Sequence, residues 1–443
     1  MLFFPPPVVA DAPPVPQAPM AMSLPDALSR AKADNAMLRA AKARVDERRG
    51  LITTVRADAL PQVTLIGDFT RVRDVSMLNG NMTGLFNLFN AFETKPGVVL
   101  PPFNVSNLVT PITLYTTQAT VAQPLFYWGK IGTAIEIAGM GEKEAAFAYT
   151  TAELDVLHGV AKAYLAVLAS QAELDVVEAR KKTAEQFLSD VKAKLEAQSA
   201  TELDRLRAES EYLAVVPESL QAEANYKRAL EVLNGQLGLD PRTPLKLEDI
   251  GLPPSGETHA PGERSELAQL KQQETMLKAN DRVLKSDLRP KFDLSASYGY
   301  QTNKTQNLFK EPYDAWKVSV TMRFPVFDGL RSSGRRAQNA AQAEQVRQLR
   351  LDKERAIAVE KSTAARELEK ATAFHQAATK AHDAGLEALR MSRESYEQGL
   401  ITSLDLLQAE RTERLLESQR RRAELGLWAA RFDQRRALGL PPL

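Results

Sequence analysis

The chain has 443 residues, with 57 basic and 56 acidic side chains and a formal net charge of +1. Such balanced charge gives no support for a nucleic-acid-binding protein. The chain has no cysteine, which excludes disulfides, thiolate metal sites and cysteine nucleophiles. No run of about 18 apolar residues is present, so we expect no transmembrane helix, whereas transmembrane strands stay possible because their signal is weak in each segment.

The first 22 residues form a Pro-rich segment that we expect to be disordered, because eight prolines lie between Met1 and Pro25. No basic residue precedes the apolar Leu2-Phe3-Phe4, so the segment is not a complete secretory signal. However, Ala10-Asp11-Ala12 fits a small-x-small cleavage site. The end of a truncated signal and a disordered tail therefore stay equal alternatives.

The chain contains an internal repeat with two offsets. Pro124-Leu125-Phe126 returns 201 residues later as Pro325-Val326-Phe327, and Leu237-Gly238-Leu239 returns as Leu438-Gly439-Leu440. Further upstream the offset is 229 residues, since Ala59-Leu60-Pro61 pairs with Leu288-Arg289-Pro290. A repeat of this length predicts a duplicated architecture. We expect a first structural repeat over 23–240, a linker over 241–262 and a second repeat over 263–443.

Each copy has the same predicted order of elements: helix, strand, loop, strand, very long helix, short break and returning helix. In the first copy these are helix 23–59, strands 61–73 and 112–126, and helices 129–198 and 201–238. In the second copy they are helix 264–288, strands 291–301 and 315–327, and helices 330–398 and 402–438. The long helix nearly equals the other two helices together, so each copy can form a coil of one continuous and one broken helix.

The strands of the second copy alternate between apolar and polar residues, as in Phe292-Asp293-Leu294-Ser295. Their length of about ten residues is what a tilted strand needs to cross a bilayer. Aromatic residues near the strand ends suit interfacial girdles. A soluble two-faced sheet is the alternative, and residues 113–123 of the first copy show no clear apolar face.

Four strands are too few to close a membrane barrel, since the smallest outer-membrane barrels have eight. Open sheet edges would leave backbone groups unsatisfied in lipid. If these strands cross a membrane, the protein must form an oligomer, with twelve strands from three copies or eight from two.

The order and spacing of these features over 23–443 resemble the outer membrane efflux protein family, the TolC-like outer membrane factors. The matching sequences are PLFYWG and PVFDG at the strand-to-helix junctions, YEQGLITSLD at a helix tip, and LGL at the end of each half. The resemblance implies a mixed α and β membrane protein. Long antiparallel coiled-coil helices would form an α-barrel, and four transmembrane β-strands per protomer would complete a 12-stranded β-barrel in a homotrimer. It also places the 241–262 linker in an equatorial region.

The resemblance further implies a trimeric outer-membrane channel, the exit duct of a tripartite efflux or type I secretion system. The duct would passively conduct substrates from an inner-membrane transporter and a periplasmic adaptor across the periplasm and outer membrane. It would be located in the cell outer membrane, with a large periplasmic portion. Its partners would be these proteins and outer-membrane lipid, without nucleic acid. The alternative is a soluble periplasmic coiled-coil adaptor or scaffold. Because we find no nucleophile–base set, phosphate loop or metal-ligand spacing, we expect no enzyme activity, cofactor or metal.

The resemblance also implies a periplasmic gate at the helix tips. Tyr396 matches a tyrosine of the family's closing network, although a packing role is the alternative. Asp405 matches an acid that lines the entrance, and Gln408 stands where a second acid is found in the family. Asp204 is the counterpart of Asp405 in the first copy, and we name these four residues the gate candidates.

The same tips have a structural interpretation. Thr201-x-x-Asp204 and Thr402-x-x-Asp405 resemble capping boxes, with Asp in place of the usual Glu or Gln. A helix start favours an acid at this position whatever the function. We therefore expect Thr201, Gly399 and Thr402 to be hairpin-tip adaptor contacts or caps. Gln198 stands where the second copy has Gly399, so the first turn should differ from the second.

Overall fold

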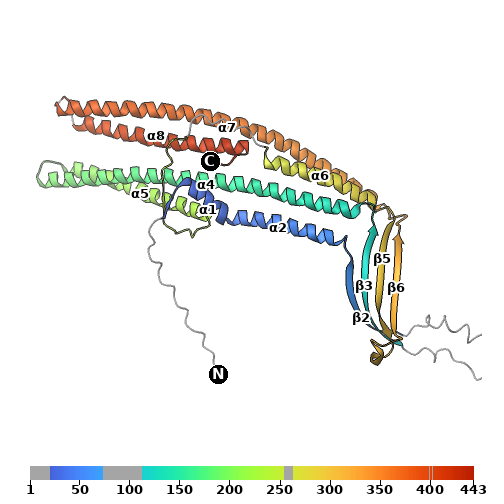
Figure 1. The fold of residues 1–443 in the computed structure, drawn as a ribbon. Helices are drawn as coiled ribbons and strands as arrows, with labels where there is room; N and C mark the ends of the chain where they lie inside the picture. The colour runs from blue at the N-terminus through green and yellow to red at the C-terminus, as the bar shows by residue number, and fades with distance from the viewer. Residues whose placement is uncertain (1–19, 73–111, 254–262, 399, 402) are drawn as a thin grey trace, which may run out of the picture. The chain divides into compact units, whose positions relative to one another are not determined.

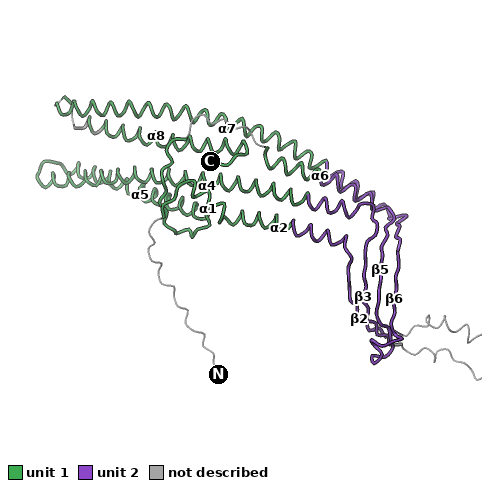
Figure 2. The backbone as a smooth tube through the Cα atoms, in the orientation of Figure 1, with its two compact units in different colours: residues 1–48, 140–275, 344–443 green, residues 49–139, 276–343 purple. Residues whose placement is uncertain are grey.

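The computed structural model describes residues 20–72, 112–253, 263–398, 400–401 and 403–443. It forms two compact units, each taking segments from both sequence repeats (Figure 2). Unit 1 comprises 1–48, 140–275 and 344–443, and unit 2 comprises 49–139 and 276–343. None of the described helices contains a stretch long and apolar enough to cross a membrane.

Four long helices form two hairpins. Helix α4 (Lys130–Glu196) returns as α5 (Glu202–Gln236), and α7 (Arg331–Glu397) returns as α8 (Ser403–Leu438). The 67 residues of α4 and of α7 each extend about 100 Å at 1.5 Å per residue. The structure confirms the predicted long and returning helices within two residues of each boundary.

Unit 2 contains a four-stranded antiparallel sheet in the order β2-β3-β5-β6 (Figure 1). The strands are β2 (Gln62–Val72), β3 (Ile112–Phe126), β5 (Lys291–Thr302) and β6 (Asp314–Arg323). A 3-10 turn (Thr305–Asn307) lies between β5 and β6. The predicted strands are confirmed, although β6 ends at Arg323 rather than at residue 327, shortly before Pro325.

The helix predicted over 23–59 is broken at Asn35 into α1 (Leu24–Asp34) and α2 (Ala36–Ala57). Asn35 has extended backbone angles, and its Oδ1 accepts hydrogen bonds from the backbone N–H groups of Met37 (2.9 Å) and Leu38 (3.3 Å). Asn35 therefore acts as the N-cap of the second helix. In the second copy the corresponding helix is α6 (Ser265–Ser286).

Two short strands lie within the segments that were predicted to be disordered and to be a linker. Residues 1–19 of the first segment and 254–262 of the second lie outside the described residues. Met20–Met22 is strand β1, which pairs in parallel with β4 (Leu245–Leu247) inside the predicted linker. The pairing forms because Met22 and Leu245 are buried in a common core. The proposed division into two repeats and a linker otherwise stays a prediction.

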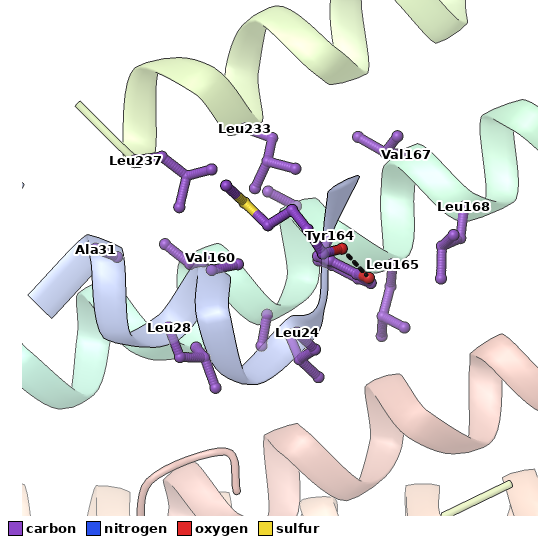
Figure 3. Close-up of a cluster of buried hydrophobic side chains, with 14 of the residues drawn as sticks. Leu24, Leu28, Ala31, Val160, Tyr164, Leu165, Val167, Leu168, Leu233 and Leu237 are labelled. Carbon is purple, nitrogen blue, oxygen red and sulfur yellow. Dashed lines mark hydrogen bonds between the residues drawn. The ribbon is translucent and has the colours of Figure 1, made fainter. Parts of the chain in front are cut away.

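This core lies in unit 1 and takes residues from α1, α4, α5 and α8; Figure 3 labels those of the first three helices. Tyr164 of α4 is completely buried, with its hydroxyl within hydrogen-bond distance of the carbonyls of Met22 (3.0 Å) and Glu248 (2.6 Å). Burial raises the pKa of Tyr164 to about 12. The hydroxyl thus stays protonated and holds the ends of β1 and β4 against α4.

Candidate functional site

The turn of the first hairpin contains the capping box read from the sequence. The Thr201 hydroxyl accepts a hydrogen bond from the Asp204 backbone N–H (3.2 Å), and the Asp204 carboxylate accepts one from the Thr201 backbone N–H (3.0 Å). The Thr201 hydroxyl also donates to this carboxylate (2.6 Å). This last bond, followed by the backbone bond, holds the pKa of Asp204 below its usual value. Asp204 is therefore a charged helix cap at the tip.

The preceding turn closes α4 with a Schellman motif. The Ser199 N–H bonds to the Lys194 carbonyl (2.8 Å), and the Gln198 N–H bonds to the Leu195 carbonyl (2.9 Å). Gln198 takes the position that requires a left-handed backbone, with φ 56°. At the second tip, the Leu400 N–H bonds to the Ser395 carbonyl (2.9 Å) in the same pattern. The two turns thus share a hydrogen bond, although glycine is absent from the first.

The second hairpin places three gate candidates around its tip. Tyr396 lies in the last turn of α7 with 44% of its surface exposed, and Asp405 lies in the first turn of α8. Gln408 follows one turn later and is also exposed. Gly399 and Thr402 lie outside the described residues, as does the capping box predicted for Thr402.

Ion pairs link the two hairpins within unit 1. Arg422 of α8 pairs with Glu173 of α4, and Arg436 pairs with Asp155. Asp433 accepts hydrogen bonds from Lys162 (3.1 Å) and lies 2.7 Å from the Nε2 atom of His158. These pairs lie between α4 and α8. The hairpins are therefore joined along the part of the helices next to the core rather than at the tips alone.

The register of the sheet collects the large apolar side chains on one face. Residues that pair across antiparallel strands lie on the same face. The register aligns Val63 with Val121, Val121 with Ala296, and Ala296 with Val318. The most exposed large side chains of this face are 61–81% exposed, namely Val63, Leu65, Phe69, Trp316, Val318 and Val320. We call this surface the apolar face.

The opposite face is mainly polar, with small hydroxyl groups beside charged residues. One row across it contains Thr64, Thr120, Ser297 and Lys317. Another contains Ser295 and Ser319, whose hydroxyl oxygens are 2.8 Å apart. A sheet whose exposed face is apolar and whose other face is polar can separate lipid from water.

The register also shows which side chains of β3 lie on the apolar face, which the sequence alone did not indicate. The alternation of 113–123 is obscured by its many threonines. The pairing nevertheless places Tyr115, Ala119 and Val121 on the apolar face. The aromatic rings of Phe69 and Tyr115 contact each other there, with centroids 5.2 Å apart. Strand pairing, rather than local sequence, therefore identifies the face of β3.

Both edges of the sheet are open among the described strands. Strand β2 pairs only with β3, and β6 pairs only with β5. These edge strands have 11 and 10 residues, so a long row of backbone donors and acceptors lacks a partner strand. Because the number of strands is even and all neighbours are antiparallel, β6 of one copy can pair antiparallel with β2 of another.

A cationic cluster surrounds Asp287 where helices and strands meet in unit 2. The Asp287 carboxylate lies 2.6 Å from the Lys130 ammonium, 3.5 Å from that of Lys291 and 3.8 Å from the Arg335 guanidinium. Partial burial raises the pKa of Asp287, but the hydrogen bond and charge of Lys130 and the charge of Lys291 outweigh it, so the pKa lies below its usual value. The Asp287 carboxylate thus forms ion pairs with three cations.

In the part of the chain that the structure describes, no three histidine or acidic side chains form a group that could hold a metal ion.

Comparison with known proteins relates this architecture to a family. A model described as "Outer membrane efflux protein" matches residues 27–239 and 259–439. The pyoverdine export outer membrane protein OpmQ of Pseudomonas aeruginosa is 26% identical over 229 residues. That match covers 50% of this chain and 48% of OpmQ, so the chain spans about half the length of this relative.

Two solved channels are similar over nearly the whole chain. The Campylobacter jejuni CmeC outer membrane channel has a TM-score of 0.75 at 13% identity, covering 94% of this chain and 85% of its own. The open state of the Neisseria gonorrhoeae MtrE outer membrane channel has a TM-score of 0.73 at 18% identity, covering 94% and 89%. At these identities the similarity establishes the fold.

Proposed function

Because this chain belongs to the outer membrane efflux protein family, we propose that it is the exit duct of a tripartite efflux or type I secretion system. It is an outer-membrane protein with a large helical portion in the periplasm and the TolC-like combination of α-barrel and β-barrel segments. In the proposed role it conducts substrates passively from an inner-membrane transporter and a periplasmic adaptor. The transporter supplies the energy, and this chain supplies a path rather than catalysis.

One observation carries the proposal: a sheet with an exposed apolar face, a polar face and two open edges. A soluble adaptor would have to expose the apolar face to water at a cost of about 25 cal/mol for each Å². In lipid this face is favourable, but the open edges then need partner strands. Three copies joined through β6 and β2 supply twelve strands, so we propose a homotrimer.

The gate and the adaptor contact are also proposals. We place the gate at Tyr396, Asp405, Gln408 and Asp204, because these residues lie at or near the hairpin tips on exposed surfaces or first helical turns. We place the adaptor contact at the turns that contain Thr201, Gly399 and Thr402. A charged cap such as Asp204 can both start its helix and present negative charge at an entrance.

A pair of arginine substitutions on β6 tests the membrane role. Val318→Arg adds a charge to the apolar face near the middle of the strand, where lipid would penalise it by about 2–4 kcal/mol. Thr321→Arg adds the same charge to the polar face of the same strand. We expect Val318→Arg to abolish recovery of detergent-soluble trimer from the outer membrane, while Thr321→Arg assembles normally.

The oligomer is measured on the wild-type protein. Light scattering in detergent should give three times the 48.9 kDa of one chain, and the particle should conduct ions in planar bilayers. A monomer that is stable in plain buffer, or equal tolerance of both substitutions, would support the soluble alternative and exclude the duct.

A further inference from the structure

An arginine–tryptophan pair stands at the end of the sheet where the strands meet the helices. The Arg289 guanidinium carbon lies 5.1 Å from the centroid of the Trp128 ring. The indole N–H of Trp128 donates to the Pro290 carbonyl (2.6 Å), and its ring meets the edge of Phe126 with centroids 4.9 Å apart. The ring is thus held in place while it supports the cation, as in a cation–π contact.

The pair lies at the rim of the apolar face. Phe126 pairs with Phe292, which the register places on that face. Large apolar side chains that are 45–51% exposed stand beside the pair in the sequence, namely Leu125, Phe126 and Leu288. A tryptophan with an apolar body and a fixed polar edge is typical of the boundary between hydrocarbon and headgroups.

The neighbouring cations have carboxylate partners, whereas Arg289 has an aromatic one. Lys130, Lys291 and Arg335 share Asp287. Arg323 lies 3.7 Å from Asp293, and Arg336 lies 3.3 Å from Asp281. Across the described residues, no ion pair involves Arg289. Its hydrogen-bond donors are therefore available to an anion from outside the chain.

We infer that Arg289, supported by Trp128, binds the phosphodiester of a phospholipid in the periplasmic leaflet. A planar guanidinium matches a phosphate with two parallel hydrogen bonds, and the exposed apolar rim matches acyl chains directly beside it. The inference rests on the proposed function, because only a sheet inserted in a membrane brings lipid to this rim. Helix α6 ends and α4 begins at this end of the sheet, so the leaflet next to the proposed periplasmic helices is the periplasmic one.

Lipid binding by the delipidated, detergent-purified protein tests the site. The probe is phosphatidylglycerol, titrated while bound lipid is counted by native mass spectrometry. Arg289→Ala should lower the affinity about tenfold, as expected for a lost charge-assisted contact. Arg289→Lys keeps the charge without the planar fork and should bind with intermediate affinity. The control is Arg282→Ala, which removes an exposed arginine of α6 that pairs with Glu136 of α4. This variant should bind the lipid like wild type.

Three results would overturn the inference. The first is equal phosphatidylglycerol affinity in wild type and Arg289→Ala. The second is complete displacement of the lipid by inorganic phosphate, which would make the site one for free anions. The third is an equal loss of purified lipid A binding in Arg289→Ala, since lipid A belongs to the other leaflet.

The outcome is separable from that of the proposed function. Arg289→Ala should keep the trimer mass and the ion conductance of wild type, because Arg289 is neither in the proposed interface nor at the tips. Failure of the wild-type protein to form a conducting trimer would refute the duct. Loss of lipid with conductance retained supports the site, and Arg289→Lys gives a second measurement if Arg289→Ala does not fold.

Discussion

Asn35 and Arg264 perform the same structural task in the two halves of the chain. The Asn35 side-chain amide donates to the Gln236 carbonyl at 2.8 Å, and the Arg264 guanidinium donates to the Ala437 carbonyl at 2.9 Å. The two donors are separated by the 229-residue offset of the sequence repeat, and the two acceptors by its 201-residue offset. Both acceptors belong to the end of a returning helix, where carbonyls lack helical partners.

A left-handed glycine ends each returning helix next to the side chain that donates to it. Gly238 and Gly439 have left-handed φ values of 71° and 80°, as the closing Leu-Gly-Leu sequences allow. A Cβ atom on Gly238 would lie 2.9 Å from the Asp34 carbonyl oxygen. The end of each returning helix is thereby attached to the residue that precedes α2 or α6.

Replacing Asn35 by alanine should destabilise the protein by about 1–2 kcal/mol. The substitution removes the N-cap of α2 and the donor to Gln236 together. The measurement is thermal unfolding of the detergent-solubilised protein by circular dichroism. Asn225→Ala on the exposed surface of α5 is the matched control and should leave the melting temperature nearly unchanged. Equal melting temperatures for Asn35→Ala and the control would contradict the capping role.

Replacing Arg264 by methionine should cost about 1.5–3 kcal/mol at neutral pH, because Arg264 is 3% exposed and its loss leaves Glu266 with Arg436 as its remaining cationic partner among the described residues. The effect should depend on pH. Partial burial raises the pKa of Glu266, but hydrogen bonds from Arg264 and Arg436 outweigh it and hold this pKa at about 2. The carboxylate therefore stabilises the fold above its unfolded pKa of 4.5, and this contribution is lost as the pH falls toward 2.

The difference in melting temperature between wild type and Arg264→Met should accordingly narrow from pH 5 to the most acidic pH at which both remain folded. Arg282→Met removes an exposed arginine from a pair with Glu136 and should give a small, pH-independent difference. A gap for Arg264→Met that stays constant with pH would show that Glu266 is not the linked group.

Local interactions explain which parts of the fold are readable from sequence. The capping box of Thr201 and Asp204 is recognisable because both partners lie within one helical turn. The break at Asn35 is not, since alanine-rich flanks favour helix and its side-chain amide binds Gln236, far along the chain. Strands β1 and β4 have three residues each and depend on packing around Tyr164.

The candidate site likewise has features that the sequence predicts and features that it does not. The faces of β5 and β6 follow from their alternation, whereas the face of β3 required the register with both neighbours. The proposed gate roles of Tyr396, Asp405 and Gln408 would depend on contacts between copies in the proposed trimer, so no pattern within one copy determines them. Their assignment came from resemblance and stays a prediction.

Replacing Gln198 by glycine should stabilise the first hairpin tip by up to about 1 kcal/mol. Gln198 has φ 56°, a conformation that costs a side-chain-bearing residue about 1–2 kcal/mol and glycine little. The readout is slower hydrogen exchange at 194–201. Glu196→Gly, placed inside the last helical turn, is the control and should have the opposite effect of about 1 kcal/mol. Faster exchange in Gln198→Gly would show that the side chain contributes more than the backbone strain costs.

Replacing Gly299 by alanine should disturb the pairing of β5 with β3 and cost about 1–3 kcal/mol. A Cβ atom at this position would lie 2.1 Å from the Thr117 carbonyl oxygen and 2.5 Å from the Gln118 Cα atom, so backbone must move. Gly67→Ala on β2 is the matched control, because nothing lies within 4 Å of its Cβ position. We expect less trimer from Gly299→Ala and wild-type yield from Gly67→Ala. Equal trimer yields from the two variants would mean that β3 and β5 accommodate the extra Cβ atom without loss of stability.

Replacing Asp405 by alanine tests whether the second hairpin tip forms an acidic entrance. In the proposed trimer, three copies of Asp405 approach one axis and attract cations, so the substitution should change single-channel conductance. It should also raise the concentration of divalent cation needed for block by about tenfold, or ~1.4 kcal/mol. Glu417→Ala removes one exposed charge from α8 about 18 Å further along the helix and should leave both quantities unchanged. If Asp405→Ala lowers the melting temperature while conductance and block stay as in wild type, the residue starts its helix and has no part in the entrance.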